Sequence, residues 1–199
     1  MINYIEEVTE LNLNDWFLKG FTFEQYSNQM TVNKDEMLSI YERFTLPIED
    51  AEFLEKLQAK QLRVIVLTED WCGDALVNSP ILLKIAQASN MEVRFILRDQ
   101  NLELMDQYLT NGTSRSIPIF VFIDQNGEEH AVWGPRAKEV QSMVDRERAT
   151  LPANDAPDFK DKQTEMFKKF RESYINDATI WDQVSASIIT LLKEKNPEQ

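Results

Sequence analysis

The run Leu62-Arg63-Val64-Ile65-Val66-Leu67-Thr68, followed by Glu69-Asp70-Trp71-Cys72-Gly73-Asp74-Ala75, decides the fold of this chain. Its first part is rich in branched apolar side chains, a pattern typical of a strand buried on both faces. A helical pattern follows from about residue 75 to residue 88, with Pro80 inside it, where we expect a kink. The cysteine therefore stands at the junction of a buried strand and a helix.

The segments that follow predict the rest of a small mixed sheet. Residues 93–97 read as a second strand and residues 102–109 as a second helix. Two further apolar runs, 117–123 and 129–133, flank an Asn-Gly turn, which is a strong hairpin signal. A helix over about 136–148 completes the order β-α-β-α-β-β-α, so we expect an α/β domain with helices on both faces of the sheet.

Helical patterns also extend this domain at both ends. We divide the chain into an N-terminal helical extension (1–57), a central domain (58–148) and a C-terminal linker and helical extension (149–199). In the last part the pattern predicts two helices that meet near Asn176-Asp177. Each extension has an apolar stripe at helical spacing, so we expect both to pack on the central domain.

Composition and charge exclude several functions. The chain has 199 residues, is 43% hydrophobic and has a formal net charge of -13. Nucleic acids and anionic lipids are bound by clustered Lys and Arg, so we expect neither as a partner. No apolar run approaches the roughly 20 residues of a membrane span, and the acidic start does not resemble a signal peptide. We therefore expect a cytoplasmic protein without membrane contact.

Cys72 is the only cysteine and His130 the only histidine. One cysteine cannot form an internal disulfide, and the pair cannot complete a four-ligand zinc site. The sequence thus predicts no metal and no cofactor. His130 lies in the return strand of the predicted hairpin, where a structural role is the simpler interpretation.

Three motifs in order resemble the thioredoxin superfamily over residues 58–148. They are Trp71-Cys72-Gly73 at the strand-to-helix junction, Ser116-Ile117-Pro118 at the start of the hairpin, and Gly134 after its last strand. Together with Arg98-Asp99 and Trp133-Gly134-Pro135-Arg136, the motif Trp71-Cys72-Gly73-Asp74-Ala75 looks like a little-characterised bacterial branch. The resemblance implies a thioredoxin fold with N- and C-terminal helical extensions.

The same resemblance assigns candidate roles to matching positions. Cys72 matches the attacking cysteine, whose thiolate a helix N-terminus favours. Pro118 matches the cis-proline beside the sulfur, and the backbone of Ile117 would pair with a bound substrate strand. The candidate substrate-binding residues are Trp71, Gly73, Asp74, Ile117, Pro118, Arg115 and Arg98.

Three departures from the family pattern bear on chemistry. Ala75 stands where a dithiol thioredoxin has its resolving cysteine, so an external thiol would have to release any mixed disulfide at Cys72. Asp74 replaces a proline and, with Glu69 and Asp70, adds negative charge that opposes thiolate formation. Val66 and Phe95 occupy the places of the family's buried acid and lysine. General disulfide reductase activity is therefore not expected.

Arginines near the motif are possible counterweights to this negative charge. Arg98 and Arg115 lie at the edge where the family has its active site, and a guanidinium there can stabilise a thiolate or a carboxylate. Arg136 could stabilise a thiolate or a carboxylate in the same way, with less support from the sequence. Ordinary solvated arginines on an acidic protein are the alternative.

Two functions of different classes fit the sequence. One is thiol–disulfide exchange at an exposed Cys72, with client protein thiols or small-molecule thiols as partners and an external thiol for resolution. The other is a binding or adaptor module that keeps the fold without turnover. The reactivity of Cys72 separates them, and the sequence leaves the oligomeric state open.

Overall fold

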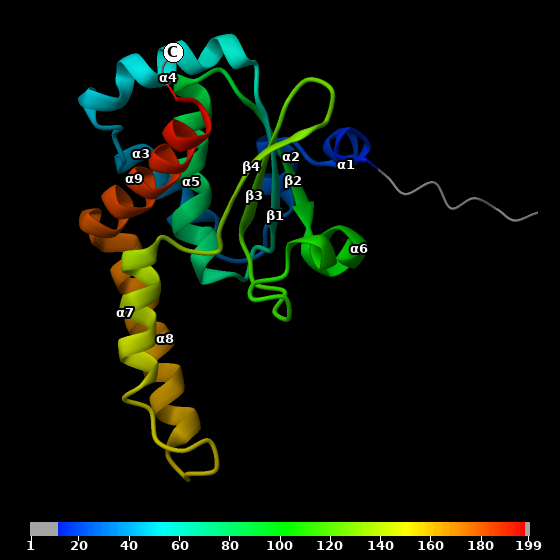
Figure 1. Cartoon of the computed structure of the whole chain (residues 1–199). Coiled ribbons are helices and arrows are strands. Elements are labelled where there is room, and N and C mark those ends of the chain that lie inside the picture. Colours follow the sequence, from blue (N-terminus) through cyan, green and yellow to red (C-terminus); the bar gives the residue numbers. More distant parts are fainter. Residues whose placement is uncertain (1–11, 198–199) are drawn as a thin grey trace, which may run out of the picture.

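The structure is a computed structural model of the chain, and it describes residues 12–197. Its centre is a four-stranded sheet of order β2-β1-β3-β4 (Figure 1). The first two strands pair in parallel and the other pairs are antiparallel. The strands are β1 (Arg63–Thr68), β2 (Glu92–Leu97), β3 (Ile119–Ile123) and β4 (Glu129–Trp133). The predicted mixed sheet flanked by helices is confirmed.

Alternation along the strands gives the sheet two apolar faces. In β1, Val64 and Val66 belong to one core cluster, whereas Ile65 and Leu67 belong to the other. The whole strand is buried, which explains its nearly continuous apolar sequence. The sheet is therefore the middle layer of a three-layer domain.

Helices cover each face of the sheet (Figure 1). The larger cluster receives side chains from α2, α3, α4, α5, α7, α8 and α9, and the smaller one from α1, α6 and the start of α5. The helices are α1 (Leu13–Lys19), α2 (Phe23–Gln29), α3 (Lys34–Arg43), α4 (Ala51–Leu57), α5 (Gly73–Ala88), α6 (Leu102–Met105), α7 (Lys138–Arg148), α8 (Phe159–Asn176) and α9 (Ala178–Lys195). α5 contains Pro80 and runs without interruption past it.

The N-terminal extension contacts the edge of the sheet. The peptide N–H and C=O groups of Phe21 pair with those of Phe95 in β2, with N···O distances of 2.9 and 2.8 Å. Thr22 caps α2 through a capping box, as its position before the helix predicts. The part of the predicted N-terminal helical segment that falls on residues 1–11 lies outside the described residues.

The C-terminal extension has two helices that meet at Asp177, as the sequence predicts. α9 packs on α5, and its buried side chains belong to the main core cluster. α8 runs beside α7, and the two helices project together from the body of the molecule (Figure 1). Val144, Met166 and Phe170 form the apolar contact between them.

Some element bounds differ from those that the sequence suggests. The helix predicted over 102–109 is a short α6 followed by a 3-10 turn over 106–108. The helix predicted from about residue 136 begins at Lys138, after an extended Ala137. Within residues 12–197, no helix combines the length and the apolar character that crossing a membrane requires.

Candidate functional site

Cys72 lies directly before the first turn of α5, at its N-cap position. Its side chain is 7% exposed, so the expectation of an exposed thiol is wrong. The thiol donates a hydrogen bond to the carbonyl oxygen of Ile117, with an S···O distance of 3.4 Å. This contact requires the protonated sulfur, because a thiolate has no hydrogen to donate.

Burial and a neighbouring charge hold the thiol in its protonated form. Burial first, and then the negative charge of Asp74, raise the pKa of Cys72 to about 11. The backbone N–H groups of Ala75 and Asp74 and the charge of Arg136 act in the opposite direction. Burial wins this competition, and the resting protein has a thiol that ionises far above neutral pH.

Asp74 is held by two groups from the C-terminal part of the chain. Arg136 forms a two-point ion pair with its carboxylate, at 2.8 and 2.5 Å. The hydroxyl of Tyr174, in α8, donates to the same carboxylate at 2.9 Å. The carboxylate and guanidinium are 12% and 16% exposed, so solvent screens this pair weakly.

A cavity of about 470 Å³ opens beside Cys72. The motif forms one wall, and α7, α8 and the loop residue Arg136 form the other. Its lining residues are Asn33, Trp71, Cys72, Gly73, Asp74, Arg136, Val144, Arg148, Phe167, Phe170, Arg171 and Tyr174. The sulfur is therefore buried by protein atoms and still borders a space of small-molecule size.

The loop before Cys72 is fastened to the N-terminal extension through Asp70. Its carboxylate accepts hydrogen bonds from the backbone N–H of Thr31 at 2.7 Å and from the Thr31 hydroxyl at 3.0 Å. The amide of Asn33 donates to the carbonyl oxygen of Asp70 at 2.8 Å. Asp70 thus holds the loop before Cys72 against the N-terminal extension.

The structure places Arg98 and Arg115 in ion pairs with nearby carboxylates. Arg98 contacts Asp99 at 2.6 Å, and Arg115 contacts Asp106 at 2.6 Å. Neither arginine lines the cavity beside the sulfur. Arg98 also lies 4.9 Å above the ring of Trp71, which is 52% exposed. Both guanidinium groups are thus positioned by neighbours on this edge of the domain.

Ile117 contacts the sulfur, and the Pro118 that follows it lies against Gly134. The Ile117–Pro118 and Gly134–Pro135 peptide bonds are both cis. Gly134 has a φ of +132°, and a Cβ added there would lie 2.3 Å from the carbonyl oxygen of Pro118. Only glycine allows these two backbone segments to approach so closely. Gly73 has no atom within 4 Å of such a Cβ and lines the cavity.

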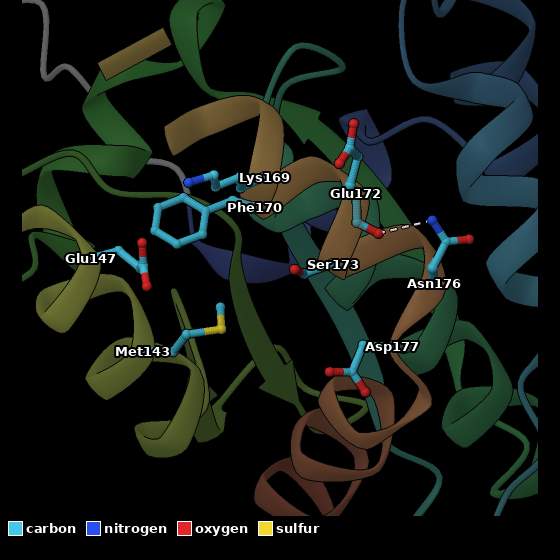
Figure 2. Close-up of a pocket in the computed structure, with 8 residues that line it drawn as sticks. All are labelled: Met143, Glu147, Lys169, Phe170, Glu172, Ser173, Asn176 and Asp177. Carbon is cyan, nitrogen blue, oxygen red and sulfur yellow. Dashed lines mark hydrogen bonds between the residues drawn. The ribbon is translucent and has the colours of Figure 1, made fainter. Parts of the chain in front are cut away.

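A second hollow, of about 670 Å³, lies between α7, α8 and the start of α9 (Figure 2). Figure 2 shows the carboxylates of Glu147 and Asp177 in its wall, with Lys169 beside Phe170. Its acidic lining contrasts with that of the cavity beside Cys72. Within residues 12–197, no three His, Cys, Asp or Glu side chains are grouped as a metal site would need.

Sequence reasoning missed the contribution of α8 to this site. Phe167, Phe170 and Tyr174 lie at helical spacing, so they share one face of the helix. That aromatic stripe is visible in the sequence and indicates a buried contact. Its partner is not visible, because Tyr174 reaches a carboxylate 100 positions earlier in the chain.

Comparison with known families identifies the class of protein. A family model described as thioredoxin matches residues 20–150. The match covers more than half of the chain. This chain belongs to the thioredoxin family, as a member with one cysteine.

Solved structures support the same fold over nearly the whole chain. A protein of unknown function from Pseudomonas aeruginosa aligns with a TM-score of 0.62 and 17% identity, covering 90% of this chain and 98% of that one. An HIV epitope-scaffold aligns with a TM-score of 0.58 and 16% identity, covering 88% and 99%. No curated protein matches the sequence.

Proposed function

We propose that this protein performs one-thiol disulfide exchange at Cys72. The observation on which this rests is the position of the sulfur, at the N-terminus of α5 and in the wall of a cavity. The thiolate attacks one sulfur of a bound disulfide, a new S–S bond forms, and the departing sulfur takes the electron pair. The proton of Cys72 passes to solvent and then to the departing thiolate.

An external thiol completes the cycle. Ala75, 3% exposed, stands where a resolving cysteine would be needed, and the chain has no second cysteine. A small thiol would attack the mixed disulfide, releasing Cys72 as a thiol and leaving with the substrate's sulfur as a new disulfide. Reduced small thiols are abundant in the cytoplasm, the location that the sequence predicts.

The high pKa of Cys72 makes this chemistry selective. With a pKa of about 11, roughly one thiol in ten thousand is ionised at pH 7. Disulfides that merely collide with the protein therefore react slowly. A disulfide held in the cavity gains effective concentration at the sulfur, which offsets the scarcity of thiolate.

A second candidate function is a binding module without turnover. The protonated, buried thiol favours it, since the Sγ–H···O contact to Ile117 gives Cys72 a structural role. In that case the cavity would hold its ligand and Cys72 would stay a thiol throughout.

The test is formation and release of a mixed disulfide. Wild type is incubated with glutathione disulfide at pH 8, and intact mass is followed over time. We expect one glutathione adduct on Cys72, its removal by reduced glutathione, and no adduct on Cys72→Ser. Iodoacetamide alkylation should be slow at pH 8 and reach half of its maximum rate near pH 11. A wild type that gains no adduct would refute exchange with this disulfide and favour the binding module.

A further inference from the structure

The cavity beside Cys72 has a charge opposite to that of the whole chain. The chain has a net charge of -13, yet the cavity lining contains three arginines and one carboxylate. That carboxylate, Asp74, is already paired with Arg136. Of the other two guanidinium groups, that of Arg171 is paired with Glu36, which does not line the cavity, so Arg148 supplies the uncompensated positive charge.

Arg148 and Arg171 differ in their hydrogen bonds and ion pairs. Arg171 pairs with Glu36 and also lies 3.4 Å from the side-chain oxygen of Asn33. Arg148 is exposed at the end of α7, and its side chain has no hydrogen bond or ion pair with the residues that the structure describes. A free guanidinium at the rim of a cavity is suited to a planar anion such as a carboxylate.

The remaining lining is aromatic and apolar. Trp71 and Phe167 are 52% and 49% exposed, the values of side chains at an opening rather than in a core. Val144, Phe170 and Tyr174 form the buried part. A cavity of about 470 Å³ lies within the size range of small-molecule sites.

We propose that this cavity binds a low-molecular-weight disulfide with a carboxylate beside an aromatic or other apolar part. Arg148 and Arg171 hold the carboxylate, Trp71 and Phe167 cover the apolar part, and the disulfide lies against Cys72. The exchange step rests on the function proposed above, whereas the binding does not. The end of α7 and the helix α8 thus supply the substrate selectivity of the site.

Binding is measured without chemistry in Cys72→Ser, because a chain with no thiol cannot react. The probe is dithiobis(nitrobenzoate), an aromatic disulfide with two carboxylates, which quenches tryptophan emission. Trp71 reports on the cavity, since the other three tryptophans are buried. We expect saturable quenching that Trp71→Phe removes. Adding Arg148→Gln should weaken binding about fivefold, the effect of one partly exposed charge contact.

Arg146→Gln is the matched control. Arg146 lies in the same last turn of α7, is exposed, and does not line the cavity. Arg146→Gln changes the net charge by the same amount as Arg148→Gln, so we expect the affinity for the probe to equal that of Cys72→Ser within error. Equal weakening by both substitutions, or by neither, would overturn the proposed site.

Exchange is measured in wild type with the same probe and with dithiodipyridine, an uncharged aromatic disulfide. We expect Arg148→Gln to lower the ratio of the two rates about fivefold and Arg146→Gln to leave it unchanged. Binding without exchange would refute the redox function and leave the anion site standing. If exchange occurs and Arg148→Gln leaves the ratio of the two rates unchanged, the anion site is refuted and the redox function stands.

Discussion

Replacing Asp74 with Asn should make Cys72 more reactive. The carboxylate of Asp74 is the largest charge effect that raises the pKa of Cys72, second only to burial. Asn keeps a side-chain oxygen that can accept from Tyr174 and loses the negative charge. Arg136 then faces the sulfur without its counter-charge, so both electrostatic changes favour the thiolate.

The size of the effect follows from opposing factors. Removing one close negative charge is worth about 1.4 kcal/mol, which is about a tenfold rise in thiolate at pH 8. A less basic thiolate is intrinsically a weaker nucleophile, and this lowers the rate per thiolate about threefold. We expect a net rate increase of about threefold. Leaving the guanidinium unpaired should cost about 3 kcal/mol of unfolding free energy.

The assay is iodoacetamide alkylation at several pH values, with urea unfolding to verify that the variant is folded. Glu139→Gln is the charge-matched control, because Glu139 is exposed in the first turn of α7 and does not line the cavity. It should react like wild type. An Asp74→Asn rate equal to or below the wild-type rate would refute the view that this carboxylate opposes ionisation of Cys72.

Three further outcomes follow from the same geometry. Gly134→Ala should lower the unfolding free energy in urea by at least about 3 kcal/mol, because its Cβ would lie 2.3 Å from the carbonyl oxygen of Pro118; Gly73→Ala, with open space around its Cβ, should be neutral or slightly stabilising. The pKa of the Cys72 thiol is higher in the folded than in the unfolded protein. The protonated thiol therefore stabilises the fold fully below pH 8.5, and this part of the unfolding free energy is lost as the pH rises towards 11. Between pH 8 and pH 10.5 wild type should therefore lose about 2 kcal/mol more than Cys72→Ser in urea unfolding. Ala75→Cys should raise insulin reduction driven by dithiothreitol above the low rate of wild type, because an internal thiol attacks the mixed disulfide at high effective concentration.

The sheet and its order were accessible from the sequence because each signal is local. The apolar run 62–68, the Asn-Gly turn and the strand-to-helix junction each depend on neighbours a few positions away. The same holds for the break at Asp177 between the last two helices. Local patterns of this kind, in the family's order, are sufficient to predict the thioredoxin fold.

The protonation state of Cys72 was not accessible, because distant segments decide it. The motif indicates an exposed thiol at a helix N-terminus, and a helix N-terminus favours the thiolate. Burial by segments such as the one containing Ile117 outweighs that effect in the folded protein. The cavity was hidden for the same reason, since Arg148, Phe167 and Arg171 have no recognisable spacing to the motif.

The two acids of the motif loop each contact one of the two extensions. Asp70 binds the segment around Thr31, and Asp74 binds Arg136 and Tyr174. Leaving the buried carboxylate of Asp74 unpaired would be costly, and Tyr174 of the C-terminal extension supplies one of its partners. Asp74, the departure whose charge raises the pKa of Cys72, is thus also the residue that ties Tyr174 of α8 to the motif. The low general reductase activity that we predict and the cavity beside Cys72 would then have one structural cause.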